Sequence, residues 1–327
     1  MPRPPRRLRP EAETEMSVRV ETRAQPRPVA ARQVHSKLVE AQTRLAWILL
    51  APSLLVVSVV ALIPLLQTIS QSFTNARLAS ERPVSFVGLT NYVNLLTDTD
   101  FLRSIWVTVQ FTIITVVCEF LLGLLIALVV NSNFKGRGFM RAAMLVPWAI
   151  ITVVSAQMWK WMYNDIYGVV NDFLVDKLHI LSSNVAWVSN PTTQLPAIEA
   201  IDIWKATPFV ALLLLAGLQV IPGDIYEAAR VDGANGIQQF FNLSLPLLRP
   251  AIVVTMIFRT LDSLRVFDVF YVMFGSNPTT MPMAVYAQQN IVSFSLLGYG
   301  STVAIAIFVI IGVFVVAYMT FLKVEAT

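Results

Sequence analysis

Long uncharged apolar runs recur along this chain and constrain its fold more than any other feature. The run WILLAPSLLVVSVVALIPLL, which begins at Trp47, is long enough to cross the hydrocarbon core of a bilayer as a helix. A spanning segment must satisfy its own backbone N–H and C=O groups, because the bilayer core holds no water to bond them. Only 13% of the residues are charged, compared with roughly 25% in soluble domains. The sequence therefore predicts an all-α polytopic membrane protein.

The pattern of runs predicts six transmembrane helices. Polar or glycine-containing segments separate the runs, and several of the runs carry internal prolines. A proline inside a bilayer helix is tolerated where neighbouring groups satisfy the backbone that it frees. The predicted spans are residues 45–69, 105–130, 140–162, 197–220, 247–274 and 298–322.

The distribution of basic residues predicts the orientation of these spans. Residues 1–43 are rich in proline, arginine and glutamate, so we expect a disordered tail, with Met16 as an alternative start. Residues 44–325 are expected to form the transmembrane domain. The tail is strongly basic, and so is the stretch KGRGFMR after the second span, whereas the loop after the fifth span has no basic residue. Because loops rich in Lys and Arg stay in the cytoplasm, we expect both termini to be cytoplasmic.

A polar stretch, EAARVDGANGIQQFFNLSLP at residues 227–246, separates the fourth and fifth spans. Asp224 and Glu227 have the spacing of a capping box, which predicts the start of a short helix. Gly233 fits the C-terminal stop of that helix, and GIQQFFNLSL predicts a second one. A compact helix–turn–helix projection with small alanines on its surface suits insertion into a groove on a partner. A plain structured loop between two spans is the alternative.

The same stretch resembles the EAA loop of ABC-importer permeases, in which EAA is followed four residues later by glycine and then, after nine residues, by a segment written LSLP here. FVGLTNY, IWKATPF and FRTLDSLRVFDVFYV resemble sugar permeases of the MalF/UgpA type, and WKATPFVALLLLAGL and VDGA resemble trehalose importers within it. The likeness covers most of residues 44–322. It implies a type I ABC-importer permease (MetI-like) fold with a cytoplasmic coupling helix in the loop 222–246. The residues that it implies for ATPase coupling are Glu227, Ala228, Ala229, Asp232 and Gly233.

The resemblance also implies a function and a set of partners. The chain would be one permease subunit of a binding-protein-dependent importer of a sugar, with trehalose first, then maltose or another α-linked oligosaccharide, then glycerol 3-phosphate. Its partners would be a second homologous permease chain, two ATPase subunits and an extracytoplasmic sugar-binding (lipo)protein, in the lipid bilayer of a bacterial cytoplasmic membrane and without nucleic acid. ATP and Mg would bind the ATPase subunits, which would carry out the hydrolysis.

The chain itself is expected to be neither an enzyme nor a cofactor carrier. It has no G-x-x-x-x-G-K-S/T phosphate loop. One cysteine and two histidines leave little from which to build a metal site. We therefore expect no catalytic residue, no metal and no bound cofactor on this chain.

Four charged residues lie at steps of three in the fifth predicted span: Arg259, Asp262, Arg265 and Asp268. A charge at the centre of a bilayer costs roughly 2.5–3.5 kcal/mol, so these residues must pair or face a wet cavity. Two interpretations stay open: two salt bridges that fix helix packing, or a set that partly lines the translocation path. The resemblance favours the second, with Arg259 structural. The residues predicted to bind the sugar are Asp262, Arg265, Asp268, Tyr271 and Asn290, with Gln289 as a further candidate.

Other polar residues in the spans give weaker signals. Glu119 could pair with Lys205 or Lys160, and Asp202 is three residues from Lys205, which predicts a pair between those two. Gly123 in the second span is most simply a place where another helix comes close.

Two other functional classes are weighed against the importer. In a proton-coupled secondary transporter the intramembrane carboxylates would carry protons. Such folds usually contain inverted repeats, and the EAA stretch has no second copy here. A membrane-embedded enzyme would need a nucleophile and base or metal ligands at membrane depth, and neither His35 nor His179 lies in a predicted span.

Overall fold

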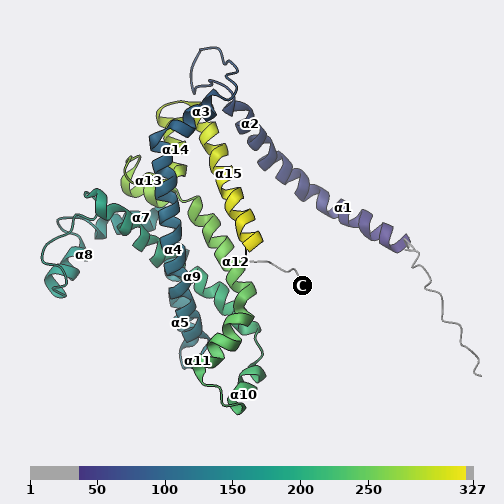
Figure 1. Ribbon diagram of the computed structural model, residues 1–327, viewed down its shortest axis with the longest axis vertical. Coiled ribbons are helices and arrows are strands. Elements are labelled where there is room, and N and C mark those ends of the chain that lie inside the picture. The colour runs from purple at the N-terminus through teal and green to yellow at the C-terminus, as the bar shows by residue number, and fades with distance from the viewer. Residues whose placement is uncertain (1–36, 322–327) are drawn as a thin grey trace, which may run out of the picture. The chain divides into compact units, whose positions relative to one another are not determined.

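Helices form most of the chain that the structure describes. The computed structural model describes residues 37–321 (Figure 1), and within that range the only β-type pairing is an isolated antiparallel bridge between Thr74 and Phe86. The chain divides into two compact units, Met1–Val60 and Ala61–Thr327, each of which is described by itself. The all-α fold predicted from the sequence is confirmed.

The first unit holds the start of the first span. Helix α1 (Lys37–Val57) begins inside the range predicted as a tail, and the rest of that prediction, residues 1–36, lies outside the described residues. A π-helical segment, η1 (Ser58–Leu62), follows α1. The apolar helix as a whole runs over Gln42–Ser72, and none of its most apolar window is buried within the chain. Its length and composition match the first predicted span.

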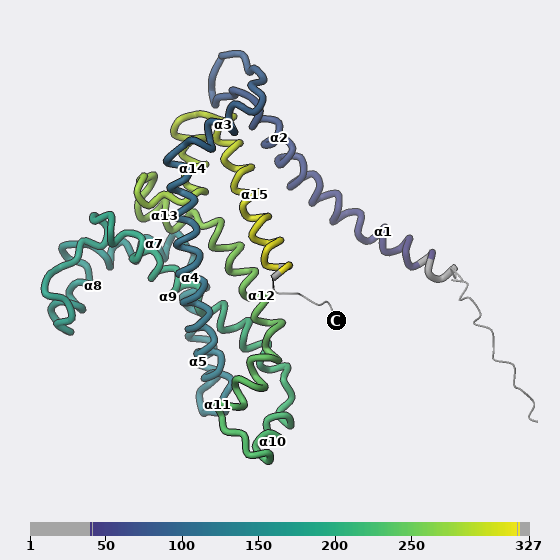
Figure 2. Tube along the Cα trace, viewed as in Figure 1, coloured from purple at the N-terminus to yellow at the C-terminus, as the bar shows by residue number. Residues whose placement is uncertain are grey.

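The second unit contains the remaining helices, and Figure 2 traces their path. Their bounds are α2 Ile63–Ser72, α3 Thr90–Thr97, α4 Thr99–Asn131, α5 Arg137–Met144, α6 Val146–Ala149, α7 Thr152–Met162, α8 Val169–Asn171, η2 Asp172–Lys177, α9 Pro191–Val220, α10 Gly223–Val231, α11 Gly236–Gln239, η3 Phe240–Ser244, α12 Leu245–Leu264, α13 Asp268–Phe274, α14 Met283–Gln288, η4 Gln289–Ser293 and α15 Leu297–Phe321.

Five helices in residues 37–321 are long and apolar enough to span a membrane, and a bent pair raises the number to six. The pair corresponds to the predicted span 140–162, which is not one straight helix: Arg137–Ala149 and Thr152–Met162 meet at 88°. Ile150 and Ile151, between the two parts, have extended backbones (ψ 134° at both). Two successive β-branched residues favour that conformation, and Pro147 one turn earlier removes a backbone donor.

The core of the second unit is built on the contact between α4 and α9, against which α12 also packs. A Cβ placed on Gly123 of α4 would lie 2.6 Å from Cγ1 of Val210 and 3.1 Å from the backbone nitrogen of Ala211, both on α9. The predicted close approach at Gly123 is therefore confirmed. Nearer the start of α4, Phe111 meets Phe270 edge to face with ring centroids 5.1 Å apart, which brings α13 into a second hydrophobic cluster.

The loop between α9 and α12 folds as two short helices, but its caps differ from the prediction. Helix α10 starts at Gly223 with Pro222 as its N-cap, so Asp224 lies in the first turn and forms no capping box with Glu227. The capping box forms at the next helix, where Asn235 and Gln238 bond each other's backbone N–H groups at 2.9 and 2.8 Å.

Gly233 ends α10 as predicted. Its φ is +82°, and the next residue, Ala234, donates its N–H to the carbonyl of Ala229 at 2.9 Å, while Gly233 donates to Arg230 at 3.1 Å. This pair of bonds is the Schellman arrangement, which satisfies carbonyls that a helix end would leave unbonded. In Figure 1 the loop lies at the opposite end of the second unit from α3 and α14.

At the end of the second unit that holds α3 and α14, one carboxylate joins three helices. Asp98 caps α4, with Oδ1 accepting the backbone N–H groups of Asp100 at 3.0 Å and Phe101 at 3.2 Å. Its Oδ2 accepts the hydroxyls of Tyr286 on α14 at 2.5 Å and Tyr299 on α15 at 2.6 Å. Burial alone would raise the pKa of this carboxyl, but the four hydrogen bonds lower it below its ordinary value of 3.8.

Asp98→Asn is expected to lower the free energy of unfolding by about 1–3 kcal/mol, because an amide replaces a charged acceptor at a helix cap and in two phenol bonds. A carboxyl with a lowered folded-state pKa stabilises the fold above its unfolded pKa and loses that contribution as the pH falls through the folded pKa. The difference between wild type and variant should therefore be full at pH 7 and shrink below pH 3.8. SDS titration at several pH values measures it. Asp100→Asn, at an exposed carboxylate 3.6 Å from Arg103, should have little effect at any pH.

Candidate functional site

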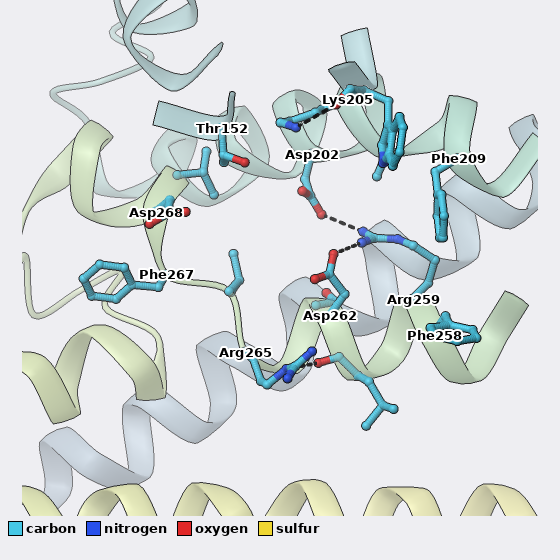
Figure 3. Close-up of a pocket in the computed structure, with 16 residues that line it drawn as sticks. Thr152, Asp202, Lys205, Phe209, Phe258, Arg259, Asp262, Arg265, Phe267 and Asp268 are labelled. Atoms are coloured by element: carbon cyan, nitrogen blue, oxygen red, sulfur yellow. Dashed lines mark hydrogen bonds and ion pairs between the residues drawn. The ribbon is translucent and has the colours of Figure 1, made fainter. Parts of the chain in front are cut away.

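A cavity of about 460 Å³, lined by charged and aromatic side chains, opens between the broken helices of the second unit. Its walls come from the α6–α7 break, from α9, and from the segment that joins α12 to α13 (Figure 3). Its lining residues are Trp148, Thr152, Asp202, Lys205, Ala206, Phe209, Phe258, Arg259, Leu261, Asp262, Ser263, Arg265, Val266, Phe267, Asp268 and Val269.

The predicted fifth span is interrupted at this cavity. Helix α12 ends at Leu264, Arg265 to Phe267 are not helical, and α13 begins at Asp268. The step of three along one ideal helix therefore holds for Arg259 and Asp262 but not for the two charges that follow. Arg265 turns back to donate its Nε–H to the carbonyl of Leu261 at 3.1 Å. Interrupted helices of this kind are tolerated in a membrane where the irregular backbone lines a cavity.

Arg259 is the centre of the charged network. It is 4% exposed, and its Nε and Nη2 donate to the two oxygens of Glu119 on α4 at 2.5 and 2.7 Å. The same Nη2 donates to Asp202 on α9 at 3.0 Å, and Nη1 donates to Asp262 on α12 at 2.6 Å. Glu119 is fully buried, whereas the side chain of Asp262 is 73% exposed. One guanidinium thus joins three helices, which agrees with a structural role for Arg259.

This network corrects the pairing predicted for Glu119, whose partner is Arg259 rather than Lys205 or Lys160. Both lysines instead donate to backbone carbonyls near helix ends, Lys205 to Trp148 at 3.4 Å and Lys160 to Val272 at 3.0 Å. The carbonyls at the C-terminal end of a helix have no partner within the helix, so a lysine that reaches one helps to satisfy the broken backbone. The predicted pair of Asp202 with Lys205 is replaced accordingly by Asp202 with Arg259.

Aromatic rings form the apolar part of the cavity wall. Trp148 stacks on Phe209 with ring centroids 5.6 Å apart and an interplanar angle of 13°. Phe258 is 58% exposed, and Phe267 lines the wall formed by the α12–α13 segment. Carboxylates accept hydrogen bonds from hydroxyls, and ammonium and guanidinium groups donate hydrogen bonds to hydroxyl oxygens. Aromatic ring faces can cover apolar surface of a ligand. The cavity therefore suits a ligand with many hydroxyls and one apolar face.

The structure brings together three of the five residues predicted to bind substrate. Asp262, Arg265 and Asp268 line the cavity, and the first and last of them present exposed carboxylates. Tyr271 is not among the lining residues and stacks on Phe267, with ring centroids 5.3 Å apart. Asn290 is buried in η4 and donates to the carbonyl of Tyr286 at 2.9 Å, so its side chain is committed within the fold.

The sequence analysis did not predict the part of the cavity wall that α6 and α9 form. It did not assign Trp148, Phe209 or Lys205 to the site. Two signals pointed to them: Trp148 follows Pro147, which marks the helix break, and Lys205 and Phe209 lie in the segment IWKATPF that already resembles the sugar permeases.

The residues predicted for ATPase coupling lie together on the loop of α10. Glu227, Ala228, Asp232 and Gly233 are exposed and Ala229 is half-buried. The hydroxyl of Tyr226 bonds that of Ser244 at 3.0 Å, which joins α10 to the last residue of η3, directly before α12. A movement of α10 would therefore act on the helix that carries Arg259.

Comparison with known proteins finds relatives among the permease proteins of sugar transport systems. A sequence profile of the family described as "Binding-protein-dependent transport system inner membrane component" matches residues 119–323. The chain is 40% identical to the trehalose/maltose transport system permease protein MalF of Thermococcus litoralis over 87% of its own length and 95% of that protein. It is 35% identical to the trehalose transport system permease protein SugA of Mycobacterium tuberculosis, covering 82% of this chain and 85% of SugA.

A solved structure has the same fold. A chain from the crystal structure of a bacterial ABC transporter involved in the import of the acidic polysaccharide alginate superposes with a TM-score of 0.76 at 22% sequence identity. The match covers 89% of this chain and all of that one.

Proposed function

The chain belongs to the family of binding-protein-dependent transport system inner membrane components, and from that premise we propose that it is one permease subunit of an ABC importer for a sugar. ATP hydrolysis on partner ATPase subunits drives the transport. The names of the relatives, which include trehalose and maltose permeases, support trehalose as the first substrate to test and maltose as the second.

One observation carries the proposal: a cavity with both carboxylates and aromatic faces lies where two membrane helices are broken. Substrate sites in membrane transporters are typically formed by discontinuous helices. Asp262, Arg265 and Asp268 are proposed to bond sugar hydroxyls, and the stacked pair of Trp148 and Phe209 offers a ring face for the apolar side of a pyranose.

The coupling loop supplies the second part of the mechanism. We propose that α10 docks in a groove of an ATPase subunit in the cytoplasm, with a homologous permease chain beside this one and a second ATPase subunit below it. Closure of the ATPases on ATP moves α10, and its contact with Ser244, directly before α12, transmits the movement to the cavity. An extracytoplasmic binding protein delivers the sugar, and both termini lie in the cytoplasm.

Reconstitution tests the proposal. Proteoliposomes that contain this chain, its partner permease and both ATPase subunits should take up labelled trehalose or maltose when ATP and a matching binding protein are present, on opposite sides of the bilayer. The uptake should stop without ATP. If the chain without any ATPase carried the sugar along a proton gradient, it would instead be a secondary transporter.

A further inference from the structure

We propose that this cavity selects uncharged sugars, and that Asp262 excludes anionic ones because it already bonds Nη1 of Arg259. This inference rests on the proposed function, because it specifies which class of sugar the same cavity accepts. It depends on the hydrogen-bond partners of the three cations in the cavity wall, Arg259, Lys205 and Arg265.

Arg259 has a single N–H donor left for an anionic substituent, the second one on Nη1, whose first N–H bonds Asp262. A guanidinium has five N–H donors, and four hydrogen bonds to carboxylate oxygens already engage its three nitrogens: two to Glu119, one to Asp202 and one to Asp262. Glu119 is buried and does not line the cavity, and Asp202 lines it with a side chain that is mostly buried. Asp262 also lines the cavity (Figure 3), and its side chain is the most exposed of the three. A phosphate, sulfonate or carboxylate that approached Arg259 would therefore meet Asp262 first.

Each of the other two cations gives one N–H donor to the backbone. Lys205 donates to the carbonyl of Trp148, and Arg265 donates to that of Leu261. The lining contains three acids and three bases, and Glu119 behind Arg259 makes four acids against three bases, a formal charge of −1. The cavity thus offers an anion no net attraction.

A hydroxyl and an anionic group differ in what they can do in such a cavity. A hydroxyl donates to the exposed carboxylates of Asp262 and Asp268 and accepts from Lys205 or Arg265. An ionised acid only accepts, so it leaves those carboxylates without a donor and is repelled by them. The same set of side chains therefore favours a neutral polyol and penalises its acidic derivative.

The test uses the assembled importer in nanodiscs, without binding protein, so that the cavity alone selects. Labelled trehalose is displaced with trehalose or trehalose 6-phosphate, and labelled maltose with maltose or maltose 6′-phosphate. In the wild type, each phosphate ester should need a concentration about tenfold or more above that of its neutral parent, the order expected for one like charge at a partly exposed site. Equal or tighter binding of the esters would overturn the inference.

Variants identify the residue responsible. Asp262→Ala removes the charge and frees Nη1 of Arg259, so the difference between ester and parent should narrow by about tenfold. Asp262→Asn removes the charge but keeps an acceptor, so its effect should be smaller. Asp100→Ala removes the same formal charge at a residue that does not line the cavity, and should leave the ratio of ester to parent unchanged. A ratio that is the same in wild type and Asp262→Ala would contradict the role of Asp262.

The outcome also separates this inference from the proposed function. If the assembled importer binds and transports neither the neutral sugars nor their esters, the proposed function fails and the inference fails with it. If it transports sugars but does not discriminate against the charged ones, only the inference fails.

Discussion

Arg259→Met is expected to lower the free energy of unfolding by about 3–5 kcal/mol, the cost of leaving a buried charge without its partner. The substitution keeps most of the side-chain volume but leaves Glu119, which is fully buried, without its two charged hydrogen bonds. It also removes the bond to Asp202, so α4, α9 and α12 lose the side chain that joins them. We expect most of the variant to be lost as aggregate during purification.

Stability of the purified chain in detergent, followed by SDS titration, measures the effect. Arg265→Met is the matched control, because it makes the same change at an exposed arginine six residues further along, whose Nε bonds only a backbone carbonyl. Its cost should stay within about 1 kcal/mol. Equal losses in the two variants would show that Arg259 has no special place in the fold.

A double variant separates the charge from the packing. In Arg259→Met with Glu119→Gln, the buried carboxylate no longer needs a cation, so part of the lost stability should return. The sum of the two single-variant losses in unfolding free energy should exceed the loss in the double variant by about 0.5–3 kcal/mol, the range found for pairs in direct contact. Strict additivity would contradict the direct pair.

Gly233→Val is expected to abolish the stimulation of ATP hydrolysis by the loaded binding protein while leaving the membrane fold intact. At Gly233 φ is +82°, and a Cβ there would touch nothing within 4 Å. The cost is therefore one of backbone conformation, roughly 1–2 kcal/mol for an L-residue in the left-handed region and more for a β-branched one. A change of that size reduces the population of the docked loop by about tenfold.

ATPase activity of the reconstituted importer, with and without loaded binding protein, measures this effect. Gly236→Val is the control from the same loop: a Cβ at Gly236 also meets nothing within 4 Å, but its φ lies outside the left-handed region. It should keep most of the stimulation. In SDS titration Gly236→Val should have wild-type stability, and Gly233→Val should lose only the few kcal/mol of the loop's backbone cost. Retained stimulation in Gly233→Val would argue against coupling through the Schellman turn.

The sequence was sufficient for features that depend on neighbouring residues or on the bilayer. The apolar runs predicted the spans to within a few residues at most ends, because the thickness of the bilayer fixes their length. Gly233 was predicted as a helix stop because a left-handed residue is most easily glycine. The capping box was placed one helix too early, since the Asp224–Glu227 and Asn235–Gln238 spacings are equally good and only the position of Pro222 decides where α10 begins.

Features that depend on tertiary contacts could not be predicted in the same way. The sequence showed that Glu119 needed a cation, but several lay on other predicted spans, and the choice of Arg259 depends on how α4 and α12 pack. The interruption after Leu264 was also hidden, because RVF has no proline or glycine. That interruption separates Arg265 from Asp268, and Tyr271 in the helix that follows stacks on Phe267.

Site-specific cross-linking of α10 tests the central claim most directly. With Cys118 replaced by serine, single cysteines at Ala228 and at Ala229 are joined by short bifunctional reagents to nearby proteins in native membranes. We expect a cross-link from Ala228, which is exposed, to an ATPase subunit, with a yield that changes when ATP is trapped. A cysteine at Ala228 that reacts with membrane-impermeant reagents added outside the cell, or that joins no nucleotide-hydrolysing protein, would contradict the claim.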